Sequence, residues 1–572
     1  MLHLIPKPKK LEEKSEYISA KTIHIVTQIS DERIQKAVQR LPLSDDGIAM
    51  EIHENGLLGE AYTLTVTREK LVLSAGGAAG LFYGIQTVRQ IFTHEKVPCL
   101  YIEDAPDFGY RGFYHDVTRG KVPKVETLKK LIDWMAYYKL NSLQLYVEHT
   151  FAFKEYADSI ERTGYLTPEE IKELDAYCYE NFIEFIPSLS CFGHLYELLQ
   201  KDQYKELCEL ENYEQEHATF CERMRHHTID PTNPKSLALV KSLIDQYMPL
   251  FRSNKFNICC DETFDLQIGR HKDMDVGRLY VDFIKQIAAY VHSKGKTVMM
   301  WADILLKHKE LIGELPEDIH FLNWYYDKTP PEADIAVFQK LQRPQIVCPG
   351  TSTWSNFFED VETEEINISR MTELGYQYGA EGVLNTNWGD FGNPCSLELA
   401  MYGMALGAAK SWSVQTKADD SFRSDINHLL YQNGHGAEYL ARLSGLGQKL
   451  NWCDFVKIYS NYIYDKKLEV HIPAENILAE MRDACEEFIS VLSAERWEND
   501  EYRVEMLLAA EGTALLAELT AQAAEYSIAR HIDTAAWLKR YRQKWLEKNK
   551  EGELSEIEKV FLFMDRVGST QA

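Results

Sequence analysis

The chain has 572 residues, more than one hydrophobic core usually organises, so two to four domains are expected. Its formal net charge of −26, from 62 basic and 88 acidic residues, makes nucleic acid and anionic membranes poor partners. The first residues contain no apolar stretch typical of a secretory signal, and no run approaches the roughly 18 apolar residues that a membrane-spanning helix needs.

Residues 1–105 have the pattern of a small α+β domain. Apolar and polar side chains alternate along 62–66 and 70–75, as in half-buried strands, and residues 80–91 repeat apolar side chains at a period near 3.6, as in a helix. The segment Asp104-Ala-Pro-Asp107 predicts the linker that ends this domain.

Residues 106–415 carry eight short strand-like runs, most of them separated by helical patterns. The runs begin at Gly112, Ser142, Phe185, Phe256, Thr297, Ile319, Gln345 and Gly382. Helices are expected over 126–138, 168–181, 236–250 and 276–293. A strand followed by a helix about eight times predicts a (β/α)8 TIM barrel of the α/β class. The competing fold is a doubly wound open sheet, but no GxGxxG sequence follows any strand.

Residues 416–572 lose the strand pattern and predict a helical C-terminal domain. Amphipathic helices are expected over 505–528 and from Thr534 onward. In the second of these, Trp537, Tyr541 and Trp545 recur every four residues and share one face. Such a stripe is expected to pack either on the barrel or on a second subunit, so a homodimer is one possible assembly.

Polar and aromatic residues follow the predicted strands, where the active sites of such barrels lie. In chain order these residues, with one arginine just ahead of the first strand, are Arg111, His115, Asp116, Glu148, His149, His194, Asp261, Glu262, Trp301, Asp303, Trp324, Tyr325, Tyr326, Trp354, Trp388 and Asp390. Tryptophans at four successive strand ends favour a sugar ligand, because an indole ring stacks on the apolar face of a pyranose while carboxylates and arginine bind its hydroxyls. The expected partner is an oligosaccharide or glycoconjugate.

The adjacent pair Asp261-Glu262 narrows the chemistry. Ordinary retaining glycosidases place two carboxyl groups about 5–5.5 Å apart across the scissile bond, normally on different strands. Neighbouring residues lie about 3.8 Å apart at Cα and project in divergent directions, which suits a reaction whose nucleophile is the 2-acetamido group of the substrate. Glu262 is then the general acid and base, while Asp261 holds the amide N–H and stabilises the developing positive charge.

The chain resembles glycoside hydrolase family 20, the β-N-acetylhexosaminidases, over roughly residues 1–410. The resemblance is carried by several motifs in order: Leu4-Ile-Pro-Lys-Pro8, Gly80-Leu-Phe-Tyr-Gly-Ile-Gln-Thr-Val88, Arg111-Gly-Phe-Tyr-His-Asp-Val-Thr-Arg119, Lys139-Leu-Asn141 and Ile258-Cys-Cys-Asp-Glu262. The helical tail resembles that of a bacterial subgroup of exo-β-N-acetylglucosaminidases. The resemblance implies an exo-glycosidase that removes terminal non-reducing β-linked N-acetylglucosamine, and N-acetylgalactosamine as well, with retention.

The resemblance also implies roles for the pocket residues. Arg111 is expected to bind the 3- and 4-hydroxyls of the terminal sugar, and Asp390 the 4- or 6-hydroxyl. His194 is expected to support the acid, with Glu148 as its partner. The walls of the acetamido pocket are expected to be Trp301, Trp324 and Trp388.

The sequence departs from the family in three places. Cys259 and Cys260 stand where the family usually has two glycines. The second strand ends in Glu148-His149 instead of the common His-x-Asp-Asp. The family's acetamido-binding tyrosine normally follows a tryptophan after the seventh strand, but Ser355 follows Trp354 here. Trp354 is therefore expected in that region, with either Tyr325 or Tyr326 supplying the hydroxyl.

Two rival functions remain. A catalytically silent sugar-binding relative would keep the tryptophans and lose the acid, yet Glu262 is present. A metal-dependent barrel hydrolase would use His115, His149, His194 and Asp303, but no HxH or HExxH sequence exists. We expect an enzyme without metal or other cofactor. The eleven cysteines show no CxxC spacing and suit a reducing compartment, so a cytoplasmic location is expected.

Overall fold

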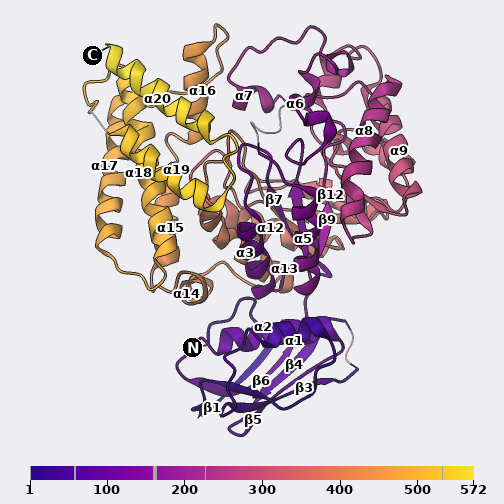
Figure 1. The fold of residues 1–572 in the computed structure, drawn as a ribbon, viewed down its shortest axis with the longest axis vertical. Coiled ribbons are helices and arrows are strands. Elements are labelled where there is room, and N and C mark those ends of the chain that lie inside the picture. Colours follow the sequence, from indigo (N-terminus) through magenta and orange to yellow (C-terminus); the bar gives the residue numbers. More distant parts are fainter. Residues whose placement is uncertain (1, 57–58, 159–163, 226, 531–532, 572) are drawn as a thin grey trace.

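A computed structural model describes residues 2–56, 59–158, 164–225, 227–530 and 533–571. It contains a sheet-and-helix layer at the N-terminus, an eight-stranded parallel barrel and a helical C-terminal region (Figure 1). The N-terminal layer lies below the barrel in this view, and the C-terminal helices stand along one side of it. None of the described helices is long and apolar enough to cross a membrane.

The N-terminal layer is a six-stranded sheet with the order β1-β6-β4-β5-β3-β2. Its strands are β1 (Lys10–Ile18), β2 (Ile23–Ile25), β3 (Ile48–Glu54), β4 (Tyr62–Val66), β5 (Lys70–Ala75) and β6 (Val97–Asp104). Two helices, α1 (Glu32–Val38) and α2 (Ala78–Ile91), lie between this sheet and the barrel (Figure 1). Helix α2 is buried nearly all round because it packs on both sides. One face meets the sheet, where a Cβ on Gly84 would lie 2.3 Å from Leu73. The other face meets the barrel, where the rings of Phe82 and Phe182 are 4.8 Å apart.

Buried charges join the N-terminal layer to the barrel. The Lys139 ammonium group, at the entrance to the second barrel strand, lies 2.9 Å from the Tyr62 hydroxyl and 3.3 Å from Asp104 Oδ2. Trp412 Nε1 donates a 2.9 Å hydrogen bond to Asp104 Oδ1. Burial lowers the pKa of Lys139, but the Asp104 carboxylate opposes this effect, as expected for a paired buried cation.

All eight expected runs form strands, and the predicted (β/α)8 barrel is confirmed. The strands are β7 (Tyr110–Asp116), β8 (Ser142–Tyr146), β9 (Glu184–Pro187), β10 (Lys255–Asn257), β11 (Thr297–Trp301), β12 (His320–Trp324), β13 (Gln345–Cys348) and β14 (Gly382–Asn387). Every neighbouring pair in the order β10-β11-β12-β13-β14-β7-β8-β9 is parallel. A parallel bridge between Ser188 and Asn257 brings the two ends of the sheet together.

Helices surround the barrel. They are α3 (Val125–Tyr137), α5 (Pro168–Glu180), α6 (Tyr196–Leu199), α7 (Thr219–Arg223), α8 (Pro234–Tyr247), α9 (Val276–Ser293), α10 (Asp303–Lys307), α11 (Glu332–Lys340), α12 (Val361–Gln377) and α13 (Met401–Trp412). Sequence signals set their ends: Thr167 and Glu170 form a reciprocal capping box at the start of α5, and Asn233 caps α8 just ahead of Pro234. The barrel interior is filled by large side chains, so it is a packed core and the site lies at its rim.

The C-terminal region is helical throughout its described elements and docks on the barrel. Its helices are α14 (Asp420–Ile426), α15 (Gly436–Leu446), α16 (Trp452–Ile463), α17 (Glu475–Ala494), α18 (Asp500–Ala523), α19 (Thr534–Lys548) and α20 (Leu554–Gln571). The predicted aromatic stripe on α19 faces the barrel: Trp537 packs edge-on against Phe357, and the Tyr541 hydroxyl donates to the Pro394 carbonyl at 3.0 Å. Of the two packing partners considered for this stripe, the barrel is therefore the one observed.

Candidate active site

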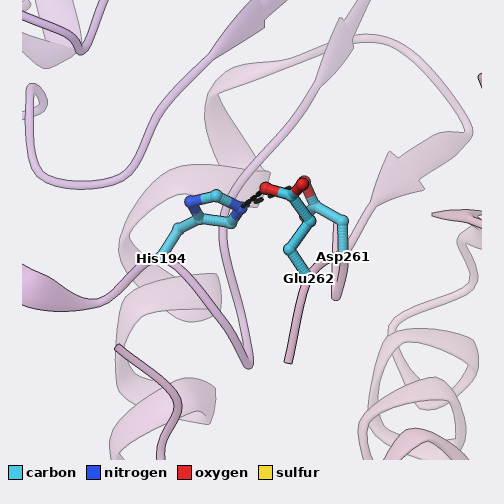
Figure 2. Close-up of side chains that lie close together, drawn as sticks. All are labelled: His194, Asp261 and Glu262. Atoms are coloured by element: carbon cyan, nitrogen blue, oxygen red, sulfur yellow. Dashed lines mark ion pairs between the residues drawn. The ribbon is translucent and has the colours of Figure 1, made fainter. Parts of the chain in front are cut away.

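The acid pair follows β10 in an unusual backbone conformation. Cys259, Cys260 and Glu262 have φ values of +55°, +67° and +48°, in the left-handed region that disfavours residues with a side chain. Each such residue costs on the order of 1–3 kcal/mol and persists where surrounding contacts fix it. The Cys259 side chain is fixed inside the barrel, with its sulfur 3.3 Å from Ser188 Oγ. The turn brings the carboxyl groups of Asp261 and Glu262 side by side (Figure 2).

One histidine contacts both carboxyl groups. His194 Nε2 lies 3.2 Å from Asp261 Oδ2 and 3.4 Å from Glu262 Oε2, as Figure 2 shows. On the other side of the ring, Nδ1 lies 3.8 Å from Glu148 Oε1. Burial lowers the pKa of His194, but the Asp261 charge and the hydrogen bonds to Asp261 and Glu262 outweigh it and raise the pKa to about 10. The ring is therefore an imidazolium at neutral pH.

Glu148 supports this histidine as a carboxylate. Burial raises its pKa, but the His149 ring 3.7 Å away and the charges of Arg119 and His194 lower it to about 2. The Tyr146 hydroxyl donates to Glu148 Oε1 at 2.7 Å, which holds the carboxylate in place. The structure thus brings His194 together with the glutamate that the sequence paired with it.

A second pair of carboxyl groups flanks Arg119, whose Nε lies 4.0 Å from Glu148 Oε1. Arg119 Nη1 lies 2.8 Å from Asp390 Oδ1 and 3.3 Å from Asp116 Oδ2. Its guanidinium lies 4.9 and 5.0 Å from the ring centroids of Tyr146 and Trp388, two rings that also pack edge-on against each other. Burial raises the pKa of Asp390 to about 6, although Arg119 acts to lower it. A planar cation beside a carboxylate is a pair suited to binding vicinal hydroxyls.

The predicted position of Arg111 in the sugar pocket is wrong. Arg111 is the second residue of β7, so it lies at the amino end of the strand, and a rise of about 3.3 Å per residue separates it by about 16 Å from Asp116 at the carboxyl end. Its Nη1 contacts Glu60 Oε2 at 2.6 Å, and its guanidinium lies 4.9 Å from the Trp412 ring. Arg111 joins the barrel to the N-terminal layer. Arg119, which follows the strand, is the arginine of the pocket.

The tryptophans expected to form the acetamido pocket gather into one aromatic cage. Trp301 and Trp388 lie with ring centroids 5.8 Å apart, and Trp324 stacks on Tyr326 at 5.0 Å with nearly parallel planes. Trp354 packs against the same tyrosine at 4.9 Å. The cage sits directly above the packed barrel interior, because its side chains belong to the same buried apolar cluster.

Of the two tyrosines that the sequence left open, Tyr326 belongs to this cage and Tyr325 does not. The Tyr325 hydroxyl donates to Asp334 Oδ2 on α11 at 2.5 Å, outside the cage. The Tyr326 hydroxyl instead accepts a 2.6 Å hydrogen bond from Trp388 Nε1. Side chains two positions apart on an extended segment share a face, so Tyr326 follows Trp324 and Tyr325 does not.

Asp303 belongs to the site for a reason that the sequence did not suggest. Its Oδ2 accepts a 3.0 Å hydrogen bond from the backbone N–H of Glu262, and this bond holds the backbone of the general acid in place. Burial, together with the charges of Asp261 and Glu262, raises the pKa of Asp303 to about 8. A neutral carboxyl at this position lets the two carboxylates stay close without a third charge.

The metal ligands of the rival hydrolase do not gather at one point. Among the described residues, the groups of three that bring ligand atoms within 4.8 Å of one another are His194 with Asp261 and Glu262, and Glu209 with Asp230 and His271. His115 instead pairs through Nδ1 with Asn387 Oδ1 at 2.7 Å. Neither group contains His115, His149 or Asp303.

Comparisons with known proteins agree with this fold. The model of the glycosyl hydrolase family 20 catalytic domain matches residues 108–426, more than half of the 572 residues, and that of domain 2 of the same family matches residues 1–105. The chain belongs to glycosyl hydrolase family 20.

Relatives and solved structures extend the likeness. A beta-hexosaminidase of Akkermansia muciniphila is 30% identical over 214 residues, covering 33% of this chain and 38% of the relative. One of Porphyromonas gingivalis is 27% identical over 290 residues, covering 43% of this chain and 36% of the relative. The chain thus matches less than two-fifths of the length of either protein. The structure of a Flavobacterium johnsoniae chitobiase superposes with a TM-score of 0.63 at 17% identity over 99% of both chains, which shows a shared fold.

Proposed function

We propose that the protein is a β-N-acetylhexosaminidase that removes terminal, non-reducing β-linked N-acetylglucosamine, and N-acetylgalactosamine as well, with retention. The observation that carries the proposal is the state of Asp261. Its Oδ2 faces the His194 imidazolium, while its Oδ1 is buried and has no hydrogen-bond partner among the described residues. A buried acceptor without a donor is costly unless a ligand supplies one, and the amide N–H of a 2-acetamido group is such a donor.

The proposed reaction has two steps and takes its nucleophile from the substrate. Glu262 donates a proton to the glycosidic oxygen as the acetamido carbonyl oxygen forms a bond to the anomeric carbon and the leaving group departs. Asp261 accepts the amide N–H and stabilises the positive charge of the oxazolinium ion. Glu262 then takes a proton from water, whose oxygen opens the ring from the face that the leaving group vacated, so the configuration is retained.

The other groups of the site hold the sugar. We assign the hydroxyls at the non-reducing end to Arg119 and Asp390, whose charged hydrogen bonds are typically worth about 1.5–3 kcal/mol each. The aromatic cage surrounds the acetamido methyl group, and the Tyr326 hydroxyl binds the acetamido oxygen. The reaction as proposed uses no metal or other cofactor.

Partner and location follow from the same proposal. The substrate is an oligosaccharide or glycoconjugate that ends in a β-linked N-acetylhexosamine, and neither nucleic acid nor a membrane is involved. We place the protein in the cytoplasm. In support, all eleven cysteines are free and buried, as suits a reducing compartment.

The decisive test compares two chromogenic substrates. The purified protein should release nitrophenol from the β-N-acetylglucosaminide and not from the plain β-glucoside, which lacks the acetamido nucleophile. Equal rates would contradict substrate assistance. Glu262→Gln should lose about 10²–10⁴-fold in kcat. Asp261→Asn should also be slow, and an unchanged rate would remove the role given to it. Asp273→Asn, a change at an exposed residue 12 positions after Asp261, is the control and should leave the rate unchanged.

The rivals predict different results in the same assays. A silent sugar-binding relative would bind the oxazoline mimic NAG-thiazoline and release no nitrophenol. A metal-dependent hydrolase would lose its activity on treatment with EDTA, whereas the proposed enzyme should keep it.

A further inference from the structure

The segment that follows Arg119 pairs with the C-terminal region. Residues 120–124 lie between β7 and α3, and residues 548–553 lead from α19 into α20. The two segments run antiparallel to each other. Three backbone hydrogen bonds join them, each from an N–H to a carbonyl: Lys124 to Lys548 at 3.0 Å, Lys550 to Val122 at 2.9 Å and Glu553 to Gly120 at 2.9 Å. The last of these bonds ends on the residue next to Arg119.

Glu553 fixes the position of this turn through a buried ion pair. Both of its carboxylate oxygens accept hydrogen bonds from the Arg223 guanidinium, at 2.6 and 2.7 Å, and Arg223 also donates to Glu197 Oε1 at 3.0 Å. All three side chains are at most 3% exposed. A bidentate pair of arginine and carboxylate is both strong and geometrically defined. The C-terminal turn is therefore attached to α7 as well as to the segment after Arg119.

The loop that carries Asp390 is held by the same region. Trp452, the first residue of α16, donates from Nε1 to the Phe391 carbonyl at 2.7 Å. The Trp452 ring is fully buried and stacks on Phe561 of α20 at 5.4 Å, which places it in the same packed body as Glu553. The acceptor is again the residue next to a charged side chain of the sugar pocket.

The two loops also touch each other, with no room for a side chain between them. A Cβ on Gly120 would lie 2.8 Å from the Gly392 backbone, and a Cβ on Gly392 would lie 2.7 Å from the Phe220 ring of α7. Both glycines have φ in the left-handed region, at +101° and +94°. Contacts that the C-terminal region makes with either loop are therefore transmitted to the pair of Arg119 and Asp390.

We propose that two residues of the C-terminal region, Glu553 and Trp452, are positioning residues. Through them that region holds Arg119 and Asp390 at the spacing that binds the 4-hydroxyl of the terminal sugar. The proposal rests on the proposed function. The general acid Glu262 belongs to the separate turn after β10, so the loss of a positioning residue should affect recognition of this hydroxyl more than the protonation step.

The test removes the hydroxyl from the substrate and a positioning residue from the protein. The substrates are the nitrophenyl β-N-acetylglucosaminide and its 4-deoxy analogue. In the wild type, loss of the hydroxyl should lower kcat/KM by about 10–150-fold, the range for a hydrogen bond to a charged group. Glu553→Ala should lower kcat/KM about tenfold for the first substrate and less than about twofold for the analogue, because an interaction that is already absent cannot be lost again. A residue that only stabilises the fold would lower both values equally.

Arg482→Met is the matched control, and two milder variants accompany it. Arg482 forms another buried ion pair of the C-terminal region, with Glu518 Oε2 at 3.4 Å. Its loss should lower the stability and leave the ratio of kcat/KM between the two substrates as in the wild type. Glu553→Gln keeps the size of the side chain, and Trp452→Phe keeps a ring beside Phe561 while removing the N–H donor. Each should lower this ratio by about threefold or more, half of the tenfold loss on a free-energy scale.

Two kinds of failure are distinguishable. Equal losses on both substrates in the Glu553 and Trp452 variants, no loss on either, or the same change of ratio in Arg482→Met would overturn the positioning role. So would a wild type that is equally active on both substrates. A wild-type protein that cleaves neither substrate and does not bind NAG-thiazoline would instead overturn the proposed function on which the positioning role rests.

Discussion

The charge on His194 should contribute a stability that depends on pH. The ring contacts two carboxyl groups at 3.2 and 3.4 Å, and an ion pair at such a distance is worth about 5 kcal/mol at an effective dielectric constant of 20. Burial of the imidazolium offsets several kcal/mol of the total. The net effect agrees with the pKa, because a rise from 6.5 to about 10 also corresponds to about 5 kcal/mol.

The direction of this pH dependence follows from a His194 pKa that is higher in the folded protein than in the unfolded chain. The stabilisation is complete below pH 6.5 and declines as the pH rises towards 10, so about 4–5 kcal/mol remains at pH 6 and about 1–2 kcal/mol at pH 9. His194→Asn removes it at every pH. Asparagine is the suitable replacement because His194 has φ +59°, and asparagine tolerates the left-handed region.

Urea titrations at several pH values measure this contribution. The difference in free energy of unfolding between the wild type and His194→Asn should narrow by about 3 kcal/mol from pH 6 to pH 9. Gln39→Asn changes an exposed, uncharged side chain at the end of α1 and should give a difference that does not vary with pH. A His194→Asn difference that stays constant across this range would refute the assignment of an imidazolium between the carboxylates.

Three further outcomes are expected. Because the pKa of Asp390 is raised to about 6, its carboxylate becomes protonated below that pH, and kcat/KM should fall there. This acidic decline in kcat/KM should be absent in Asp390→Asn. A decline that persists in the variant would belong to another group. Tyr326→Phe should weaken NAG-thiazoline binding by about 2–12-fold in calorimetry, whereas Tyr325→Phe should leave it unchanged, and the reverse order would assign the hydroxyl to Tyr325. Arg111→Met breaks a buried ion pair whose Glu60 partner is partly exposed. The free energy of unfolding measured in urea titrations should therefore fall by about 2–4 kcal/mol, with KM unchanged. A raised KM at unchanged stability would instead place Arg111 in the sugar pocket.

The barrel was predictable because its strands are short apolar runs at regular intervals. Each run had to be buried on both faces, and helical patterns separated most of them, which leaves few topologies other than a parallel barrel. The expected ends were off by a few residues at most. The run beginning at Phe256 continues in the sequence through Cys260, whereas β10 ends at Asn257; backbone hydrogen bonds to β11 still reach Ile258 and the Cys259 carbonyl, where the left-handed turn begins.

The acid pair and the tryptophans were predictable because they follow strands. Arg111 was misplaced because the motif contains two arginines, Arg111 and Arg119, and the prediction chose the one at the amino end of the strand. Arg119 comes after the strand, and the rule that barrel sites lie at carboxyl ends was enough to choose it. The choice between Tyr325 and Tyr326 was likewise contained in the alternation that begins at Trp324.

The role of Asp303 could not have been assigned in this way. Its part depends on the Glu262 N–H, a backbone group whose direction is set by three left-handed residues. A sequence pattern describes side chains and carries no signal for such a contact. The contacts between residues 120–124 and 548–553 are similar, because segments more than 420 residues apart along the chain meet only through the docking of the C-terminal helices.

The buried ion pairs between the barrel and the N-terminal layer make the stability of the barrel depend on that layer. Arg111 and Lys139 belong to the barrel, and their counter-ions Glu60 and Asp104 belong to the N-terminal layer. A fragment cut near residue 105 would leave the catalytic barrel with two cations and no compensating charge on a face shaped for α2. The N-terminal layer is separable as a unit of sequence, but it supplies the counter-charges of two buried barrel cations, so truncation from that end would destabilise the barrel itself.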